Sequence, residues 1–328
     1  MRKVFARPSA ARDGFLALLT LALIVAVSAR FPRFASPGSL ADVLDDTSIL
    51  ILLAFGQMLV ILTRGIDLSM ASNLALSGMV AALFNRTFPE LSTAAPIALA
   101  VLSGTLLGAF NGVLVWQLRL PSIVVTLGTL SIYRGMVYVL SKGTWVNSNQ
   151  MSQPFLQLVR AHFAGLSALT WLAIAAALCA AFVLRYTVFG RNVFAVGGNP
   201  QAAAYAGIDA GRVQCLAFTV SGALAGLCGY LWVSRFAVAY TDVAIGFELQ
   251  VIAACLIGGA SIAGGTGSAL GVLIGCLFLG VIKNALPLIG ISPFWQMGIN
   301  GVVITIAAVL NARGERTVKR AILEAEPV

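Results

Sequence analysis

Few residues of this sequence belong to the types that perform catalysis or bind metal ions. The chain holds a single histidine, His162, so it can assemble neither a histidine-centred metal site nor a Ser/His/Asp triad. Its five cysteines form no C-x-x-C pair and lie in or beside apolar runs, where cysteine packs as a small hydrophobic residue. The phosphate-binding pattern G-x-x-x-x-G-K-S/T is missing. We therefore expect a protein without a catalytic site, a bound metal or a cofactor.

The other candidates for chemistry are polar residues that stand within long apolar segments. Arg134 lies well inside one of them, where a charge is costly unless it pairs or faces a polar cavity. Glu248, at a comparable depth in another segment, is its candidate partner. Arg134 either extends to the nearer polar interface or lines a polar pathway. Asn73, Asn111 and Asn300 either hydrogen-bond between helices or belong to that same pathway.

The composition shows what kind of element must position these residues. Of 328 residues, 59% are hydrophobic and 10% are charged, and the mean hydropathy is +0.94. Soluble domains carry about 45–50% apolar and about 25% charged residues. Too few charges are present to keep a soluble surface hydrated, and the high apolar content excludes a disordered chain. The sequence therefore predicts an all-α polytopic membrane protein.

Charges, prolines and glycine clusters divide the chain into about ten transmembrane helices, since a span needs about 20 mostly apolar residues. The third span and the two between 247 and 284 have the least certain boundaries, because only short turns join them to their neighbours. The predicted spans are 14–30, 45–63, 69–85, 92–117, 122–141, 166–185, 212–233, 247–262, 267–284 and 294–312.

The net charge of +9 reflects the orientation of the chain. With the N-terminus in the cytoplasm, 13 of the 21 Lys and Arg residues fall inside the cell, seven fall outside and Arg134 lies within a span. The positive-inside rule favours this orientation, with both termini cytoplasmic. We expect a cytoplasmic N-terminal tail at 1–13, a long cytoplasmic loop at 186–211 and a cytoplasmic C-terminal tail at 313–328. The basic charge then gives no reason to expect a nucleic-acid partner.

Glycines recur at four-residue spacing in several predicted spans. Such glycines form a groove on one face of a helix and allow a second helix to approach closely, so we expect them to serve packing. The glycine-rich run 258–267 lacks a preceding strand and the phosphate-binding lysine, and is predicted to be a tight interhelical turn. The spaced glycines are Gly104, Gly108 and Gly112, Gly222 and Gly226, and Gly267, Gly271 and Gly275.

The long cytoplasmic loop contains the strongest local signal of the sequence. Asn199 is a suitable N-cap, Pro200 suits the first helical position, and Gly207 suits a left-handed helix stop. These residues predict a short helix of about two turns with both ends capped. Because it is rich in alanine and flanked by glycines, the helix is either a docking surface or a solvated reversal between two spans.

The same loop, from Phe189-Gly190-Arg191 through Gly197-Gly198-Asn199 to Ala206-Gly207-Ile208, resembles the cytoplasmic coupling segment of bacterial ABC sugar-importer permeases. These are the inner-membrane subunits of the ribose, xylose, rhamnose and autoinducer-2 type systems. Three further stretches resemble the family in the same order, and the matches together run from about Asp42 to Asn311. They are Gly65-Ile66-Asp67-Leu68-Ser69, Thr126-Leu127-Gly128-Thr129 with Arg134-Gly135, and Gly246-Phe247-Glu248-Leu249 with the run 257–267.

The sequence also departs from the family. Relatives often carry a glutamate and an arginine where this chain has Gln201 and Ala204, and an acidic residue where it has Gln250. The first two departures put charge-based docking on an ATPase in doubt. The run 56–63 is most similar to the rhamnose-type branch.

The resemblance implies that residues 1–328 form one permease domain of a monosaccharide importer in the bacterial inner membrane, with rhamnose or a similar sugar as substrate. It implies four partners: a cytoplasmic ABC ATPase that hydrolyses ATP, a periplasmic sugar-binding protein, an identical or paralogous second permease, and the lipid bilayer. The polar residues of the spans would then line the sugar pathway. The residues expected to couple to the ATPase are Arg191, Gly197, Gly198, Asn199, Pro200, Gln201, Ala203, Tyr205 and Gly207.

Two alternatives remain open at this point. A permease of the related branched-chain amino acid importers would have a similar architecture. An ion-coupled secondary carrier is the other, although the spans contain no series of Asp, Glu and His residues that resembles a proton relay.

Overall fold

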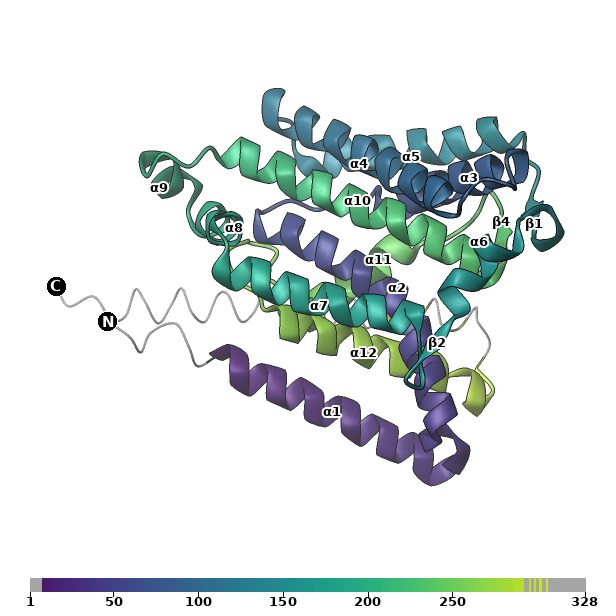
Figure 1. Cartoon of the computed structure of the whole chain (residues 1–328). Coiled ribbons are helices and arrows are strands. Elements are labelled where there is room, and N and C mark those ends of the chain that lie inside the picture. The colour runs from purple at the N-terminus through teal and green to yellow at the C-terminus, as the bar shows by residue number, and fades with distance from the viewer. Residues whose placement is uncertain (1–7, 292–294, 296–297, 299–300, 303–304, 306–328) are drawn as a thin grey trace.

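The computed structural model describes residues 8–291, together with residues 295, 298, 301, 302 and 305. In the described part of the chain, the long helices lie side by side in one bundle (Figure 1). They are α1 (Pro8–Arg30), α2 (Pro37–Leu62), α3 (Met70–Thr87), α4 (Ala94–Gln117), α5 (Ser122–Ser141), α7 (Ala168–Tyr186), α10 (Ala210–Phe236) and α12 (Ala269–Ala285).

Shorter elements connect these helices. The short α-helices are α6 (Gln153–Gln157), α8 (Val188–Gly198), α9 (Pro200–Tyr205) and α11 (Phe247–Ile257). Two antiparallel ribbons interrupt the predicted all-α fold, one between β1 (Val146–Asn147) and β4 (Val238–Ala239), the other between β2 (His162–Phe163) and β3 (Leu166–Ser167). The 3-10 turns are η1 (Pro32–Ala35), η2 (Ser148–Gln150), η3 (Leu158–Arg160) and η4 (Pro287–Ile289).

The described residues contain seven helical stretches that are long and apolar enough to cross a membrane. The predicted count of about ten is therefore not confirmed. Helices α3 and α11 are not among the seven. Helix α3 carries the polar residues Asn73 and Asn85. Helix α11 has only 11 residues, since it ends at Ile257 and is followed by Gly258 and the left-handed Gly259. Most of the tenth predicted span, 294–312, lies outside the described residues, as does the tail 313–328.

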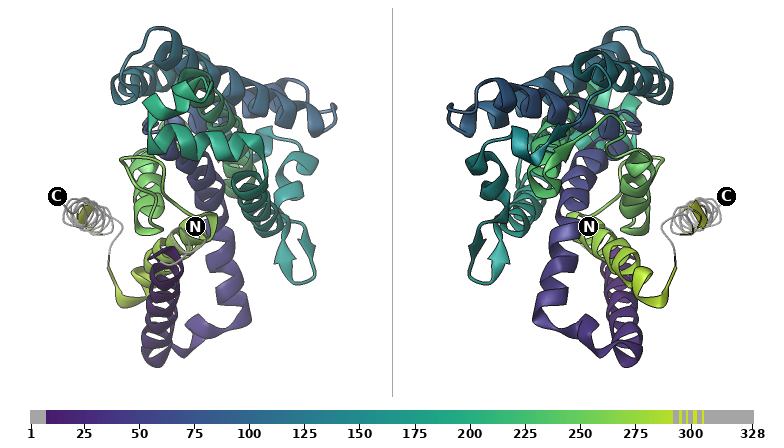
Figure 2. Two further views of the ribbon diagram at one scale, coloured as in Figure 1. Left: turned by 90° about the vertical axis from the view of Figure 1, so that its left-hand side faces the viewer. Right: turned by 90° about the vertical axis from the view of Figure 1, so that its right-hand side faces the viewer.

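Helix α2 forms the centre of the bundle. From Thr47 to Leu62 nearly every side chain of α2 is buried, and the helix contacts α7, α10, α11 and α12. A helix that is apolar all round is expected to lie inside a bundle. Helix α1, by contrast, lies at the edge of the bundle in both end views, and most of its membrane-length stretch is exposed (Figure 2).

Seven of the eight spaced glycines pack helices against each other, as predicted, whereas Gly267 lies in the turn before α12. A Cβ atom added to Gly104 would lie 2.4 Å from the carbonyl oxygen of Gly222, and one added to Gly108 would lie 2.4 Å from that of Phe218. Helices α4 and α10 therefore touch backbone to backbone. Gly271 and Gly275 of α12 make the same kind of contact with the end of α11.

The two ends of the bundle differ in structure. Helices α8 and α9 lie at one end, whereas α6 and the two short ribbons lie at the other (Figure 1). We call these the α9 end and the ribbon end. Which end faces the cytoplasm stays a prediction from the distribution of Lys and Arg.

Candidate functional site

Helix α9 has the capped structure that the sequence predicts. The side chain of Asn199 accepts a hydrogen bond from the amide of Ala202 at 3.0 Å, and Pro200 occupies the first turn. At the other end Gly207 has a left-handed backbone with φ of +80°, and the amide of Ile208 donates to the carbonyl of Ala203 at 3.0 Å. The caps satisfy groups that a free helix end leaves unpaired. They stabilise a helix that has only six residues.

One face of α9 is buried and the other is exposed to solvent. Ala203 is 3% exposed, whereas Tyr205 is 94% exposed and Gln201, Ala202 and Ala204 are exposed beside it. A tyrosine offers a large apolar surface with one polar tip, which suits it to a protein interface. The exposed face of α9 is therefore a candidate docking surface.

Helix α8, which precedes α9, was not predicted. The hydroxyl of Thr187 accepts a hydrogen bond from the amide of Gly190 at 3.1 Å and caps the start of the helix. Val193 and Val196 are buried on its inner face, while Arg191 is exposed on α8 and hydrogen-bonds to the Tyr186 carbonyl at 3.4 Å. A threonine before an apolar run is an N-cap signal, so the sequence did contain the clue.

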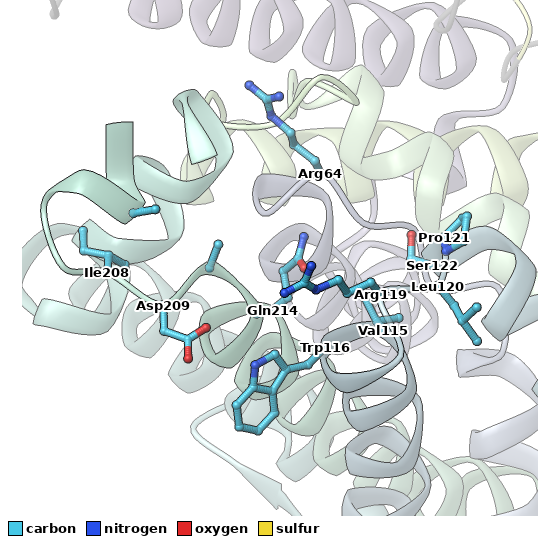
Figure 3. A pocket seen from close by; sticks show the side chains of 13 residues that line it. Arg64, Val115, Trp116, Arg119, Leu120, Pro121, Ser122, Ile208, Asp209 and Gln214 are labelled. Carbon is cyan, nitrogen blue, oxygen red and sulfur yellow. The ribbon is translucent and has the colours of Figure 1, made fainter. Parts of the chain in front are cut away.

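A cavity of about 570 Å³ opens beside α9. The ends of α4 and α10 line it with Trp116, Arg119, Asp209 and Gln214, and Arg64 lines it from the turn after α2 (Figure 3). The amide of Gln214 donates to the carbonyl of Thr63 at 2.8 Å and ties α10 to that turn. Because the lining comes from segments far apart in the sequence, the sequence alone could not reveal the cavity.

Two of the candidate pathway residues connect helices. The amide of Asn73 donates to the carbonyl of Gly104 at 3.1 Å, which joins α3 to α4. The amide of Asn111 donates to the hydroxyl of Ser69 at 2.8 Å, and its carbonyl accepts from the hydroxyl of Tyr133 at 3.3 Å. Both asparagines are at most 2% exposed. Both asparagines thus make hydrogen bonds between helices, while their place in a pathway stays a prediction.

Arg134 and Glu248 lie together near the ribbon end, apart from the asparagines. The guanidinium of Arg134 donates to the carbonyls of Thr241 and Val243, at 3.0 and 2.8 Å. Glu248 and Asp242 are acidic neighbours whose charges act on it, but among the described residues no ion pair joins Arg134 to Glu248. The predicted pairing is therefore replaced by bonds to backbone. Asn300, the remaining candidate, lies outside the described residues.

A buried carboxylate organises the turn between α2 and α3. The side chain of Asp67 accepts from the amide and the hydroxyl of Ser69, at 2.9 and 2.7 Å. The amide group of Gln57, oriented to satisfy both its atoms, bonds to the backbone of Asp67 at 3.2 Å in both directions. Through Ser69 this turn continues to Asn111 and Tyr133, so one hydrogen-bonded chain joins α2, α3, α4 and α5.

Comparison with known proteins identifies the family of the chain. A family model described as the permease component of the branched-chain amino acid transport system matches residues 39–308. The chain belongs to this permease family. It is 37% identical over 300 residues to the autoinducer 2 import system permease protein LsrC of Klebsiella pneumoniae, covering 92% of this chain and 86% of LsrC. It is 36% identical over 293 residues to the ribose import permease protein RbsC of Escherichia coli K12, covering 89% and 91%. No solved structure matches the chain.

The permease thus has two candidate sites with different roles. The α9 end carries a capped, exposed helix beside a cavity, and the bundle carries buried polar chains that join its helices. Within the described residues no group of three His, Cys, Asp or Glu side chains is placed to hold a metal ion. Sequence reasoning missed Arg64 and Gln214, because their partners lie on other elements.

The buried carboxyl of Asp67 is expected to make the stability of the permease depend on pH. Burial, the largest effect, raises the pKa of Asp67 above its ordinary value, and the bonds from Ser69 oppose this. Burial favours the neutral form of this carboxyl. The folded permease therefore has its full stability below about pH 3.9, the ordinary pKa of aspartate in an unfolded chain, and loses stability as the pH rises through the folded-state pKa. Asp67→Asn keeps an acceptor for Ser69, so the advantage of the variant in thermal midpoint should grow between pH 4 and pH 8.

The control is Asp209→Asn, at the exposed N-cap of α10, which also keeps a capping oxygen and should melt close to the parent protein. A variant at Asp67 that loses stability relative to the parent as pH rises would contradict this account. The measurement is the thermal midpoint of the detergent-purified permease.

Proposed function

We propose that this permease is the transmembrane subunit of an ATP-driven importer that carries a monosaccharide or a similar small polyhydroxylated compound across the bacterial inner membrane. The observation that supports it most is similarity over about nine tenths of the chain to import permeases for autoinducer 2 and ribose. These two compounds therefore come before rhamnose, the sugar that the sequence run 56–63 favoured. The named relatives do not favour a branched-chain amino acid as substrate.

In this proposal α9 docks on a separate ABC ATPase. The exposed face with Tyr205 would enter the ATPase, while buried Ala203 and the caps hold the helix in place. Gln201 and Ala204, both exposed and uncharged, make an apolar and shape-based contact more suitable than ion pairing. The α9 end would then face the cytoplasm, with both termini on that side.

The permease would work as a pair with an identical or paralogous copy and receive its sugar from a periplasmic binding protein. ATP binding would favour one access state and hydrolysis would restore the other, so two packings of similar energy are required. Residues 1–328 would act as a single permease domain.

The experiment that tests the function is co-purification with the ATPase and the binding protein, followed by ATPase measurement in proteoliposomes. Ribose, autoinducer 2, rhamnose and leucine are compared as ligands of the binding protein. Stimulation of ATP hydrolysis by one of the first three supports the proposal, and stimulation by leucine alone replaces it with the amino acid importer. Uptake that needs an ion gradient but no ATPase would support a secondary carrier instead.

Arg134→Leu is expected to reduce uptake without preventing accumulation of the protein. Its two bonds to the carbonyls of Thr241 and Val243 hold the segment before α11, and their loss should lower uptake about tenfold. The measurement is uptake of labelled sugar, normalised to the amount of permease. Arg86→Leu, an exposed arginine at the end of α3, is the control and should leave uptake unchanged. Full uptake by Arg134→Leu would exclude a role for this residue.

A further inference from the structure

Three segments of the chain meet next to the start of α9. They are the end of α2 (Leu62–Arg64), the end of α8 (Gly197 and Gly198), and Gly264 and Gly265 of the turn between α11 and α12. We call this meeting point the glycine junction. The amide of Gly265 donates to the carbonyl of Leu62 at 3.0 Å, which joins the first segment to the third.

Arg64 closes the junction from the side of α2. Its Nε donates to the carbonyl of Gly197 at 2.8 Å, and its Nη2 donates to the carbonyl of Gly198 at 2.8 Å. The planar guanidinium can present two donors in fixed directions, and a cation is favourable at the carbonyl end of a helix. Arg64 therefore completes the C-terminus of α8 from another part of the chain. Figure 3 shows that the Arg64 side chain points away from Trp116 and Arg119, which line the opposite side of the cavity.

The backbone at Arg64 shows that this position is specialised. Its φ is +68°, in the left-handed region where glycine usually ends a helix. A non-glycine residue in this region is strained, because its Cβ comes too close to the following carbonyl oxygen. Glycine would avoid that strain but could not make the two bonds to α8.

Gly197 and Gly265 leave no room for even a Cβ atom between the three segments. A Cβ on Gly197 would lie 1.8 Å from the oxygen of Leu62, and a Cβ on Gly265 would lie 2.5 Å from the nitrogen of Gly198. The three segments are therefore in contact through their backbones. Since Asn199 follows Gly198 directly, any displacement of α9 must act on the junction.

Hydrogen bonds connect the two interhelical turns at the junction with long helices of the bundle. The turn 63–69 is tied to α5, because Ile66 donates to the hydroxyl of Ser122 at 3.1 Å, and it contains the Asp67 chain that reaches α4. The turn 258–268 is tied to α1, because Ser268 donates to the carboxylate of Asp13 at 2.9 Å. The junction thus connects α9 with both interhelical turns.

We propose that Arg64 is the positioning residue that transmits movement of α9 to the turns 63–69 and 258–268. This inference rests on the proposed function, in which α9 docks on an ATPase. Without the Arg64 side chain, the end of α8 would lose its two hydrogen bonds to the segment after α2, and ATP hydrolysis would proceed without a matching movement of the spans.

The test uses the reconstituted permease–ATPase complex with the sugar-loaded binding protein. Three variants are compared with the parent: Arg64→Ala, Arg64→Lys and Lys142→Ala. Lys142 is the matched control, because it also has a left-handed backbone, with φ of +52°, and follows α5, outside the junction and the cavity. Among the described residues its side chain makes neither a hydrogen bond nor an ion pair. Bound ATPase, ATP hydrolysis and sugar imported per ATP are measured for each.

We expect Arg64→Ala to retain the ATPase subunit and its hydrolysis but to import at least about tenfold less sugar per ATP, with a smaller loss for Arg64→Lys. Lys142→Ala should match the parent. A merely structural role would reduce the amount of complex and leave sugar per ATP unchanged. If Arg64→Ala does not accumulate, Arg64→Lys decides: a reduced ratio supports the proposal and a parental ratio overturns it.

An equal loss in Lys142→Ala would also overturn the proposal. Failure of the proposed function gives a different result, since the parent protein itself would then bind no ATPase or show no stimulation by sugar.

Discussion

The double variant Asn199→Ala with Ala203→Pro is expected to insert and fold but to lose sugar uptake, because it destroys α9. The amide of Ala203 donates to the carbonyl of Asn199 at 3.0 Å, and proline has no amide hydrogen to donate. A proline there costs about 3 kcal/mol and loss of the N-cap about 1 kcal/mol. A loss of this size lowers the population of the docked helix by roughly 100-fold or more.

The expected readouts are sugar-stimulated ATP hydrolysis and uptake, each normalised to the folded permease. Asn199→Ser is the control, since serine is also a good N-cap and should preserve coupling. Normal coupling in the double variant would show that α9 has no role in transmitting ATP hydrolysis. The variant should remain monodisperse in detergent, because α9 lies at the end of the bundle (Figure 1).

Gly108→Leu is expected to prevent folding of the bundle. The first added carbon would lie 2.4 Å from the carbonyl oxygen of Phe218 and 2.7 Å from the Cα of Gly222. These are backbone atoms, so no rotamer change can relieve the overlap and α4 must separate from α10. Overpacking of this kind should cost about 3 kcal/mol or more. The measurement is the thermal midpoint and the monodispersity of the purified permease.

Gly128→Leu is the matched control for this substitution. Gly128 lies in the middle of α5, and a Cβ added there meets no atom within 4 Å. The control should fold like the parent and melt at a similar or higher temperature, because glycine is a poor helix former. A Gly108→Leu protein with the parental melting temperature would contradict the close approach of α4 and α10.

The sequence determined the features that depend on neighbouring residues. Asn199, Pro200 and Gly207 lie within nine positions, and their capping preferences are local properties of the backbone, so the limits of α9 follow from them. The four-residue spacing of Gly104 and Gly108 follows the helix period and predicted a packing face. Composition alone was enough to assign the chain to the membrane proteins.

Local patterns predicted the membrane spans less reliably than the caps. They predicted spans at 69–85 and 247–262, but α3 carries buried polar residues and α11 already ends at Ile257. They also missed α8, although Thr187 caps it, because the region read as a loop between two spans.

Only the tertiary structure decided which residues meet. It paired α4 with α10, turned Asn73 and Asn111 into connections between helices, and gave Arg134 backbone carbonyls in place of Glu248. The partners of Arg64 lie 133 and 134 positions further along the chain. No local preference encodes such a contact, because it exists only once the hydrophobic packing of α2, α8 and α12 has brought the three segments together.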